Sequence, residues 1–130
     1  MSYAILICDD EAQLAEEVAQ YFELNGWSVC VALSFREASE RFMSERQFDC
    51  LLTDWLLPET PGDALVAFAI ALPAGKAPKV IAIMSGVSVS LASEFGDLVN
   101  FLVRKPFDPK LVEALFLSEL EGLKVRGLRQ

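Results

Sequence analysis

Residues 50–62 read CLLTDWLLPETPG, an apolar run that ends in a carboxylate and is followed by a loop containing prolines and a glycine. Residues 50–52 suit a strand that is buried on both faces, as in the interior of a parallel sheet. Asp54 then lies at the carboxyl edge of that sheet, where open α/β folds bind their ligands. Because Pro58 disfavours helix in the residue before it and Gly62 permits unusual backbone conformations, the chain is expected to turn sharply beside Asp54. This edge is the expected functional site.

Four other apolar runs have the length of buried strands, and segments with helix signals separate them. Strands are expected at residues 4–8, 27–32, 79–84 and 99–103, and helices at residues 11–24, 35–42, 63–72, 87–96 and from 109 onward. Five strands that alternate with five helices predict an α/β fold. The sheet is expected to be doubly wound, parallel and flavodoxin-like, a (βα)5 unit with strand order 2-1-3-4-5.

Three sequence patterns predict where helices begin. Asp10 starts one capping-box pattern and Ser34 starts a second, each with Gln or Glu three residues later. Asp108 before Pro109 supplies an N-cap and a first-turn proline for the last helix. These helices are therefore expected to begin close to the carboxyl ends of strands.

The length and composition predict one domain at residues 1–124, followed by a tail at 125–130 that is either a true terminus or the start of a linker. The formal net charge of −8 argues against direct binding of nucleic acid, which needs a concentrated positive surface. No apolar run reaches the length needed to span a membrane. We therefore expect protein partners rather than nucleic acid or a membrane.

The three cysteines, Cys8, Cys30 and Cys50, all lie inside apolar runs. We interpret them as reduced, buried side chains of a cytoplasmic protein rather than as a disulfide framework. The chain contains no histidine, which removes the commonest general base and argues against ordinary Ser-His or Cys-His catalysis. The same absence, with no CxxC pair, argues against a structural zinc site.

Acidic residues follow two of the predicted strands. Asp9 and Asp10 come directly after the first strand, and Asp54 ends the third. In the order 2-1-3-4-5 these strands are neighbours about 4.8 Å apart, so the three carboxylates crowd one edge of the sheet. They repel one another unless a cation neutralises them, and their oxygen ligands favour Mg²⁺, or Mn²⁺.

Two more polar residues end neighbouring strands. Ser85 follows the fourth strand, and Lys105 follows the fifth, with a side chain long enough to reach toward Asp54. A phosphoryl group on Asp54 would have its charge met by the metal ion, the Lys105 ammonium and the Ser85 hydroxyl. Because a carboxylate can act as a phosphoryl-accepting nucleophile, we expect an aspartyl phosphate at Asp54.

Four motifs carry a family resemblance: ILICDDE at residues 5–11, DWLLP at 54–58 with Gly62 after it, IMSG at 83–86, and KPF at 105–107. Each motif is weak alone, but their combination in this order and at these strand ends is highly specific. Over its whole length, the sequence resembles a CheY-like response-regulator receiver domain of two-component signalling.

The resemblance implies that a histidine kinase or a phosphotransfer protein phosphorylates Asp54. It also implies that Asp9, Asp10 and Asp54 bind Mg²⁺, with the backbone carbonyl of Leu56 as a further ligand. Such a domain catalyses only its own phosphoryl transfer and dephosphorylation. It signals through a downstream protein, unknown here, and a homodimer is compatible with the resemblance.

One position departs from the family pattern. The family usually has an aromatic switch residue three positions before the lysine, and here that residue is Leu102. Phe101 would reach the switch position only through a bulge, because side chains alternate between the two faces of a strand. The switch is therefore either Phe101 or a position without an aromatic ring, held by Leu102.

Three rival functions lead to different expectations. A phosphohydrolase with an Asp nucleophile typically carries a second Asp two residues later, where this chain has Leu56. A P-loop nucleotide-binding protein would need GxxxxGK[ST], which does not occur. The alternative that stays open is a pseudo-receiver, an unphosphorylated protein-interaction module, which Leu102 favours and the intact Asp54 and Lys105 disfavour.

Overall fold

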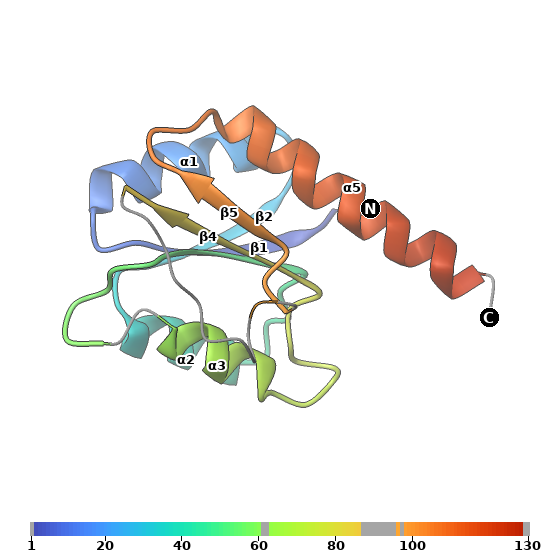
Figure 1. Ribbon diagram of the computed structural model, residues 1–130, viewed down its shortest axis with the longest axis horizontal. Helices are drawn as coiled ribbons and strands as arrows, with labels where there is room; N and C mark the ends of the chain where they lie inside the picture. The colour runs from blue at the N-terminus through green and yellow to red at the C-terminus, as the bar shows by residue number, and fades with distance from the viewer. Residues whose placement is uncertain (1, 61–62, 87–95, 97, 129–130) are drawn as a thin grey trace.

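The computed structural model describes residues 2–60, 63–86, 96 and 98–128. Five parallel strands form one sheet in the order β2-β1-β3-β4-β5, which confirms the predicted topology (Figure 1). The strands are β1 (Ala4–Cys8), β2 (Ser28–Ala32), β3 (Cys50–Asp54), β4 (Val80–Ser85) and β5 (Phe101–Arg104). Because parallel strands need crossover connections, helices connect β1 to β2, β2 to β3 and β3 to β4 along the chain.

Four described helices cover the two faces of the sheet: α1 (Ala12–Leu24), α2 (Phe35–Met43), α3 (Ala64–Ile70) and α5 (Pro109–Leu128). Figure 1 shows α1 and α5 on one face and α2 and α3 on the other. The short helix predicted at residues 87–96 falls almost entirely outside the described residues. None of the helices in the described ranges is long and apolar enough to cross a membrane.

Each face of the sheet has its own apolar core. Phe22 and Phe116, from α1 and α5, belong to the first core, and Phe42 of α2 belongs to the second. The central strand β3 contributes Leu52 to the first core and Leu51 to the second. Successive residues of β3 therefore face opposite layers, and both faces of the strand are buried, as its apolar run predicts.

The paired strands end at the same level. Cys8 of β1 pairs with Thr53 of β3, and Ser85 of β4 pairs with Arg104 of β5. The residues that follow these pairs therefore emerge together at one edge of the sheet, which is where the sequence places the acidic residues and the lysine.

Two of the predicted helix starts are confirmed. The Ser34 hydroxyl accepts a hydrogen bond from the N–H of Glu37 at 3.1 Å, at the N-terminus of α2. The carboxylate of Asp108 accepts from the N–H of Lys110 at 3.0 Å, and α5 begins between these two residues. These side chains satisfy N–H groups that a helix leaves unpaired in its first turn.

The capping role predicted for Asp10 is wrong. The N-cap of α1 is Glu11, whose side chain makes no capping hydrogen bond. The N–H of Glu11 donates instead to Oδ1 of Asp9, at 2.9 Å. Asp9 is wholly buried and takes the local hydrogen bond, so Asp10 is left exposed to solvent.

The cysteines are as predicted. Cys8, Cys30 and Cys50 are buried, and none of them forms a disulfide. Burial raises the pKa of the Cys8 thiol to about 12. Cys8 is therefore a protonated, apolar side chain at neutral pH, although its neighbour in the chain is Asp9.

The last helix is longer than expected. α5 has 20 residues and ends at Leu128, so it passes the boundary expected at residue 124. Figure 1 shows its final turns projecting beyond the sheet. Leu120 is still buried, whereas Val125 is 48% exposed. The helix therefore leaves the apolar core between these two residues.

Glu113 of α5 joins three elements of the fold. Its carboxylate accepts hydrogen bonds from the Tyr21 hydroxyl of α1, at 3.0 Å, and from the indole N–H of Trp27, at 2.8 Å. Glu113→Ala is expected to lower the free energy of unfolding by about 2 kcal/mol, because it leaves the N–H of the buried Trp27 without an acceptor. Urea denaturation measures this change. The matched substitution Glu119→Ala, at a glutamate without such donors, should cost less than about 0.5 kcal/mol.

Candidate functional site

The carboxyl edge of the sheet contains a hollow of about 350 Å³. It is lined by Asp10, Glu11, Asp54, Leu56, Gly86 and Lys105. These residues follow or end β1, β3, β4 and β5, so four segments that are distant in the sequence meet here. The convergence predicted from the strand order is therefore observed.

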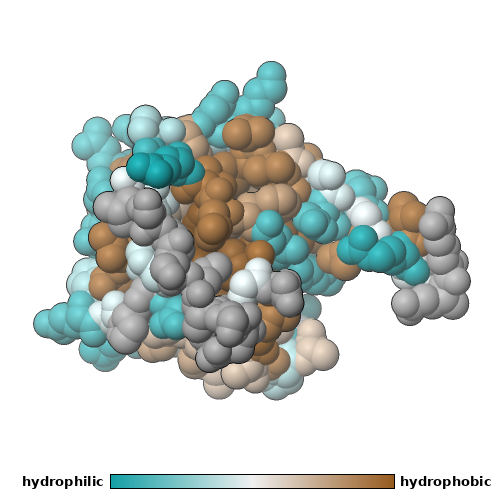
Figure 2. All heavy atoms as spheres, in the orientation of Figure 1, coloured by the Kyte–Doolittle hydropathy of each residue, from teal (hydrophilic) through white to brown (hydrophobic). Residues whose placement is uncertain are grey.

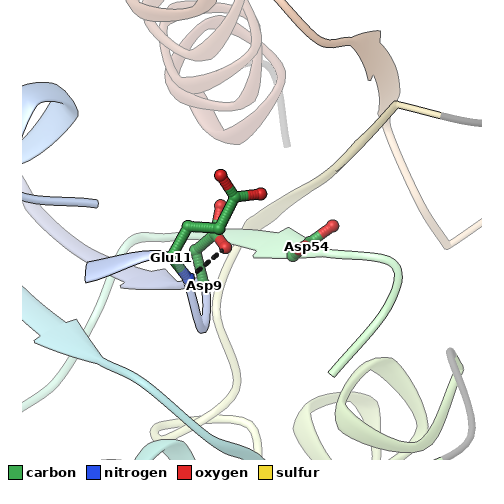
Figure 3. A group of neighbouring side chains, drawn as sticks. All are labelled: Asp9, Glu11 and Asp54. Atoms are coloured by element: carbon green, nitrogen blue, oxygen red, sulfur yellow. Dashed lines mark hydrogen bonds between the residues drawn. The ribbon is translucent and has the colours of Figure 1, made fainter. Parts of the chain in front are cut away.

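Three carboxylates approach one another at this edge. Asp9 is wholly buried, Asp54 is 7% exposed, and the Glu11 side chain is 66% exposed. One carboxylate oxygen from each lies within 4.8 Å of the other two (Figure 3). Negative charges this close destabilise one another unless a cation lies among them.

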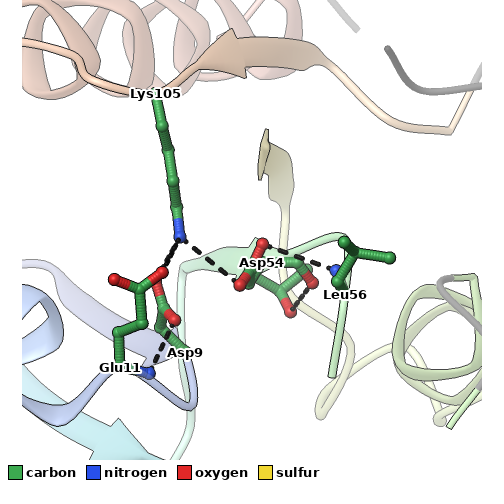
Figure 4. A network of polar contacts seen from close by, with 6 residues as sticks. Asp9, Glu11, Asp54, Leu56 and Lys105 are labelled. Atoms are coloured by element: carbon green, nitrogen blue, oxygen red, sulfur yellow. Dashed lines mark hydrogen bonds and ion pairs between the residues drawn. The ribbon is translucent and has the colours of Figure 1, made fainter. Parts of the chain in front are cut away.

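Lys105 supplies that cation. Its ammonium extends from the end of β5 toward the carboxylates (Figure 4). The nitrogen Nζ lies 2.8 Å from Oδ2 of Asp9, 3.4 Å from Oδ2 of Asp54 and 3.5 Å from Oε1 of Glu11. The side chains of Lys105, Asp9 and Asp54 are 15%, 0% and 9% exposed, so the ion pairs of Lys105 with the two aspartates are poorly screened, whereas its pair with the exposed Glu11 is screened by water.

The pKa values of Asp54 and Lys105 each depend on the charge of the other side chain. Burial raises the pKa of the Asp54 carboxyl and the charge of Asp9 raises it further, while Lys105 and the N–H of Leu56 oppose this change. Burial alone would lower the pKa of Lys105, but the hydrogen bond and charge of Asp9, with the charge of Asp54, outweigh it and raise that pKa. Lys105 is therefore a permanently charged counter-ion.

The donor atoms of the site suit a hard divalent cation. Asp9, Glu11 and Asp54 offer carboxylate oxygens close enough to share one ion. Such oxygens favour Mg²⁺ or Mn²⁺ over softer metals. The Lys105 ammonium lies against Asp9 and Asp54, so a metal ion bound to these carboxylates would compete with it for the same negative charge.

Comparison with known sequences identifies the family. The response regulator receiver domain pattern matches residues 5–116, which is most of the chain. The chain belongs to this family. The transcriptional regulatory protein SrrA of Staphylococcus aureus is 30% identical over 113 residues, which cover 86% of this chain and 45% of SrrA. The chain therefore spans less than half the length of the curated relatives it matches.

Solved receiver structures share the fold. The CheY-like receiver domain from Methylobacillus flagellatus has 30% sequence identity and a TM-score of 0.79, covering 92% of this chain and 99% of that one. A response regulator from Burkholderia pseudomallei, described with a phosphorylated aspartic acid, calcium ion and citrate, has 21% identity and a TM-score of 0.74. It covers 99% of this chain and 75% of that one.

The structure of this receiver domain places the other predicted site residues around Asp54. Ser85, at the end of the neighbouring strand β4, is buried. The N–H of Leu56 donates to Oδ1 of Asp54 at 3.4 Å, whereas metal binding by the Leu56 carbonyl stays a prediction. Asp10 lines the same hollow but lies outside the group of closely spaced carboxylates, and its role as a ligand also stays a prediction.

Leu102 lies three residues before Lys105, where the family usually has its aromatic residue, and its role as a switch stays a prediction. β4 and β5 pair in regular register from Ala82–Phe101 to Ser85–Arg104, so the bulge that Phe101 would need is absent from β5. Phe101 faces α5, with its ring centroid 6.5 Å from that of Phe116. Leu102 is 56% exposed. Figure 2 shows an apolar surface over β5 and the beginning of α5, the two elements that carry exposed Leu102 and Leu111.

Glu11 is the site residue that the sequence reasoning missed. It belongs to the run Asp9-Asp10-Glu11, of which only Asp9 and Asp10 were predicted to be site residues. A signal was present, because Glu11 continues the acidic run that follows the same strand. The structure brings the first and third members of the run to Lys105.

The raised pKa of Asp54 gives a prediction on stability. A carboxyl whose pKa is higher in the folded state than its ordinary 3.8 favours folding at low pH, and this contribution is lost as pH rises through the raised pKa. Asparagine does not ionise, so Asp54→Asn does not lose stability as pH rises through this range. The variant is therefore expected to be more stable than the wild type at about pH 7, and the difference should shrink toward about pH 4. Urea denaturation in EDTA measures the free energy of unfolding of the variant and the wild type at each pH. A stability difference that does not change with pH would contradict a raised pKa for Asp54.

Proposed function

We propose that this receiver domain, at residues 1–124, accepts a phosphoryl group on Asp54 from the phosphohistidine of a histidine kinase or a phosphotransfer protein. The observation that carries the proposal is the placement of Asp54: a nearly buried carboxylate on a hollow, 3.4 Å from an ammonium and next to a second buried carboxylate. The phosphorylated aspartic acid described for the Burkholderia pseudomallei relative supports the same chemistry.

The transfer makes one bond and breaks one. A carboxylate oxygen of Asp54 forms a bond to phosphorus while the bond from phosphorus to the donor imidazole nitrogen breaks, and the imidazole leaves with that electron pair. Lys105 and the Ser85 hydroxyl stabilise the negative phosphoryl oxygens. Asp9 and Asp10, with Asp54, would hold Mg²⁺ or Mn²⁺, and the bound ion would supply further positive charge to the phosphoryl group.

Phosphorylation then shifts a pre-existing equilibrium between an inactive and an active state of the domain, which present different surfaces. The apolar surface over β5 and the start of α5 suits a downstream protein or a second copy of the chain. Reduced, buried cysteines support a cytoplasmic location. The second candidate is a pseudo-receiver that binds its partner without phosphorylation, and the observation that favours it is an exposed Leu102 where an aromatic switch is usual.

The direct test is chemical modification of the folded chain. With acetyl phosphate and Mg²⁺, the intact mass should rise by that of one phosphoryl group, and peptide mapping should place the group on Asp54. Beryllofluoride with Mg²⁺ should perturb the same residues without forming the acyl phosphate. A folded protein that responds to neither reagent would be a pseudo-receiver. Steady turnover of a chromogenic phosphoester would indicate a phosphohydrolase instead.

Leu56 should make the phosphorylated form long-lived. Its apolar side chain is 60% exposed on the hollow beside Asp54 and has no group that could activate a water molecule. Leu56→Asp is therefore expected to accelerate hydrolysis of the aspartyl phosphate by on the order of 10²-fold, the lower range of general acid–base catalysis. Decay of the phosphorylated mass after removal of acetyl phosphate measures the rate. Leu56→Asn, similar in size but without a base, is the matched control and should be slower than Leu56→Asp.

A further inference from the structure

Apart from offering one oxygen to the group of carboxylates that suits a metal ion, Glu11 has no role in the phosphorylation chemistry described so far. It stands at a boundary, because Glu11 and Lys105 line both the hollow of Asp54 and a neighbouring hollow of about 500 Å³ between α1 and the segment before α5. Its backbone is fixed by the hydrogen bond from its N–H to Asp9. Its carboxylate therefore approaches Lys105 from the solvent-exposed side of the site.

The ammonium of Lys105 is shared among three acceptors with different surroundings. Asp9 is wholly buried and uses both carboxylate oxygens, one for the N–H of Glu11 and one for Lys105. Asp54 is the residue that gains the phosphoryl group. The Glu11 side chain is 66% exposed, so water can replace its contact with the ammonium. Of the three acceptors, Glu11 therefore loses the least free energy when Lys105 moves away.

We propose that Glu11 is a positioning residue for Lys105: its carboxylate holds the ammonium on the β1 side of the hollow until an anion on Asp54 attracts it away. This inference rests on the proposed phosphorylation of Asp54. An anion on Asp54 and the carboxylate of Glu11 then compete for one ammonium. Removing the Glu11 charge takes away one of the carboxylates that attract Lys105 and also removes a nearby like charge, so both effects favour modification of Asp54.

The expected size follows from the exposure of the pair. Exposed ion pairs are weak, so Glu11→Gln should tighten the binding of beryllofluoride, at saturating Mg²⁺, by about two- to fivefold. Glu11→Asp keeps the charge but withdraws the carboxylate by one methylene, and it should tighten binding by a smaller factor. Glu17→Gln is the matched control, since Glu17 is an exposed glutamate of α1 on the neighbouring hollow and makes no ion pair with Lys105.

Two measurements on the full chain decide the matter. In the metal-free, unmodified protein, the NMR signals of the Lys105 side chain should shift in Glu11→Gln and Glu11→Asp and stay unchanged in Glu17→Gln. The beryllofluoride titration should then follow the order given above. Lys105 signals that do not shift in Glu11→Gln would overturn the proposal. A beryllofluoride affinity equal to that of the wild type, in either Glu11→Gln or Glu11→Asp, would also overturn it.

The two proposals can fail separately. If the wild-type protein does not respond to beryllofluoride, the phosphorylation of Asp54 is contradicted, and the coupling to an anion falls with it. The Lys105 signals in the unmodified protein still report whether Glu11 positions the ammonium. If the wild type responds normally while Glu11→Gln behaves like Glu17→Gln in both measurements, only the role of Glu11 is contradicted.

Discussion

Asp54→Asn is expected to abolish phosphorylation by acetyl phosphate, leaving no mass increase above that of a sample without the reagent. The neutral side-chain amide is a poor nucleophile, so no acyl phosphate forms at this position. Asp9 cannot take over, because it is wholly buried and both of its oxygens are hydrogen-bonded. Intact-mass measurement after a fixed incubation with Mg²⁺ records the loss.

A matched carboxylate outside the hollow provides the control for this experiment. Asp63, at the start of α3, does not line the site, and Asp63→Asn should be phosphorylated like the wild type. Urea denaturation of Asp54→Asn under the conditions of the assay separates a loss of reactivity from a loss of folded structure. A phosphoryl group found on Asp10 or Glu11 in this variant would contradict the assignment of Asp54 as the acceptor.

Lys105→Met is expected to slow phosphorylation by acetyl phosphate on the order of 10²-fold, the cost of removing one electrostatic group from a transition state. The same variant should bind Mg²⁺ more tightly than the wild type, because the ammonium no longer competes for Asp9 and Asp54. The rate is measured by mass and the metal affinity by fluorescence of Trp55, the half-buried indole next to Asp54.

The opposite signs of these two effects make the prediction specific. Misfolding would weaken metal binding and phosphorylation together. Lys110→Met, a substitution of an exposed lysine on the first turn of α5, is the matched control and should leave both quantities near those of the wild type. Weaker Mg²⁺ binding in Lys105→Met would show that Lys105 does not compete with the metal ion.

The sheet and the meeting of Asp54 with Lys105 could be predicted from the sequence for a physical reason. Each strand is an apolar run that stops at a polar residue, and right-handed crossovers restrict how five such strands can be arranged. Once the order is set, the carboxyl ends of β1, β3 and β5 must lie at one edge. The observed distance of 3.4 Å between Lys105 Nζ and Asp54 Oδ2 follows from that topology and from the length of the lysine side chain.

The assignment of roles within Asp9-Asp10-Glu11 could not be predicted from local pattern. Any of these acids can accept a hydrogen bond from the first turn of α1, so the sequence favours no single one. The choice depends on a contact between residues 96 positions apart: Lys105 holds one oxygen of Asp9, and the other oxygen takes the N–H of Glu11. The hydrogen bond predicted for Asp10 is therefore made by Asp9, and the contact of Glu11 with Lys105 was not predicted.

The choice between Phe101 and Leu102 was open for a related reason. Side-chain alternation favours Leu102, but a single extra residue in β5 would reverse the faces. Only the pairing with β4 settles whether that residue is present. Its regular register leaves Phe101 partly buried against Phe116 and Leu102 on the surface.

The length of α5 determines where another molecule could contact the chain. The helix begins at Pro109, four residues after Lys105, and its 20 residues make it about 30 Å long. Glu113 and Phe116 attach its first half to the rest of the fold, while its final turns project beyond the sheet. The projecting turns therefore offer a partner a helical surface at about 30 Å from Pro109, outside the apolar core.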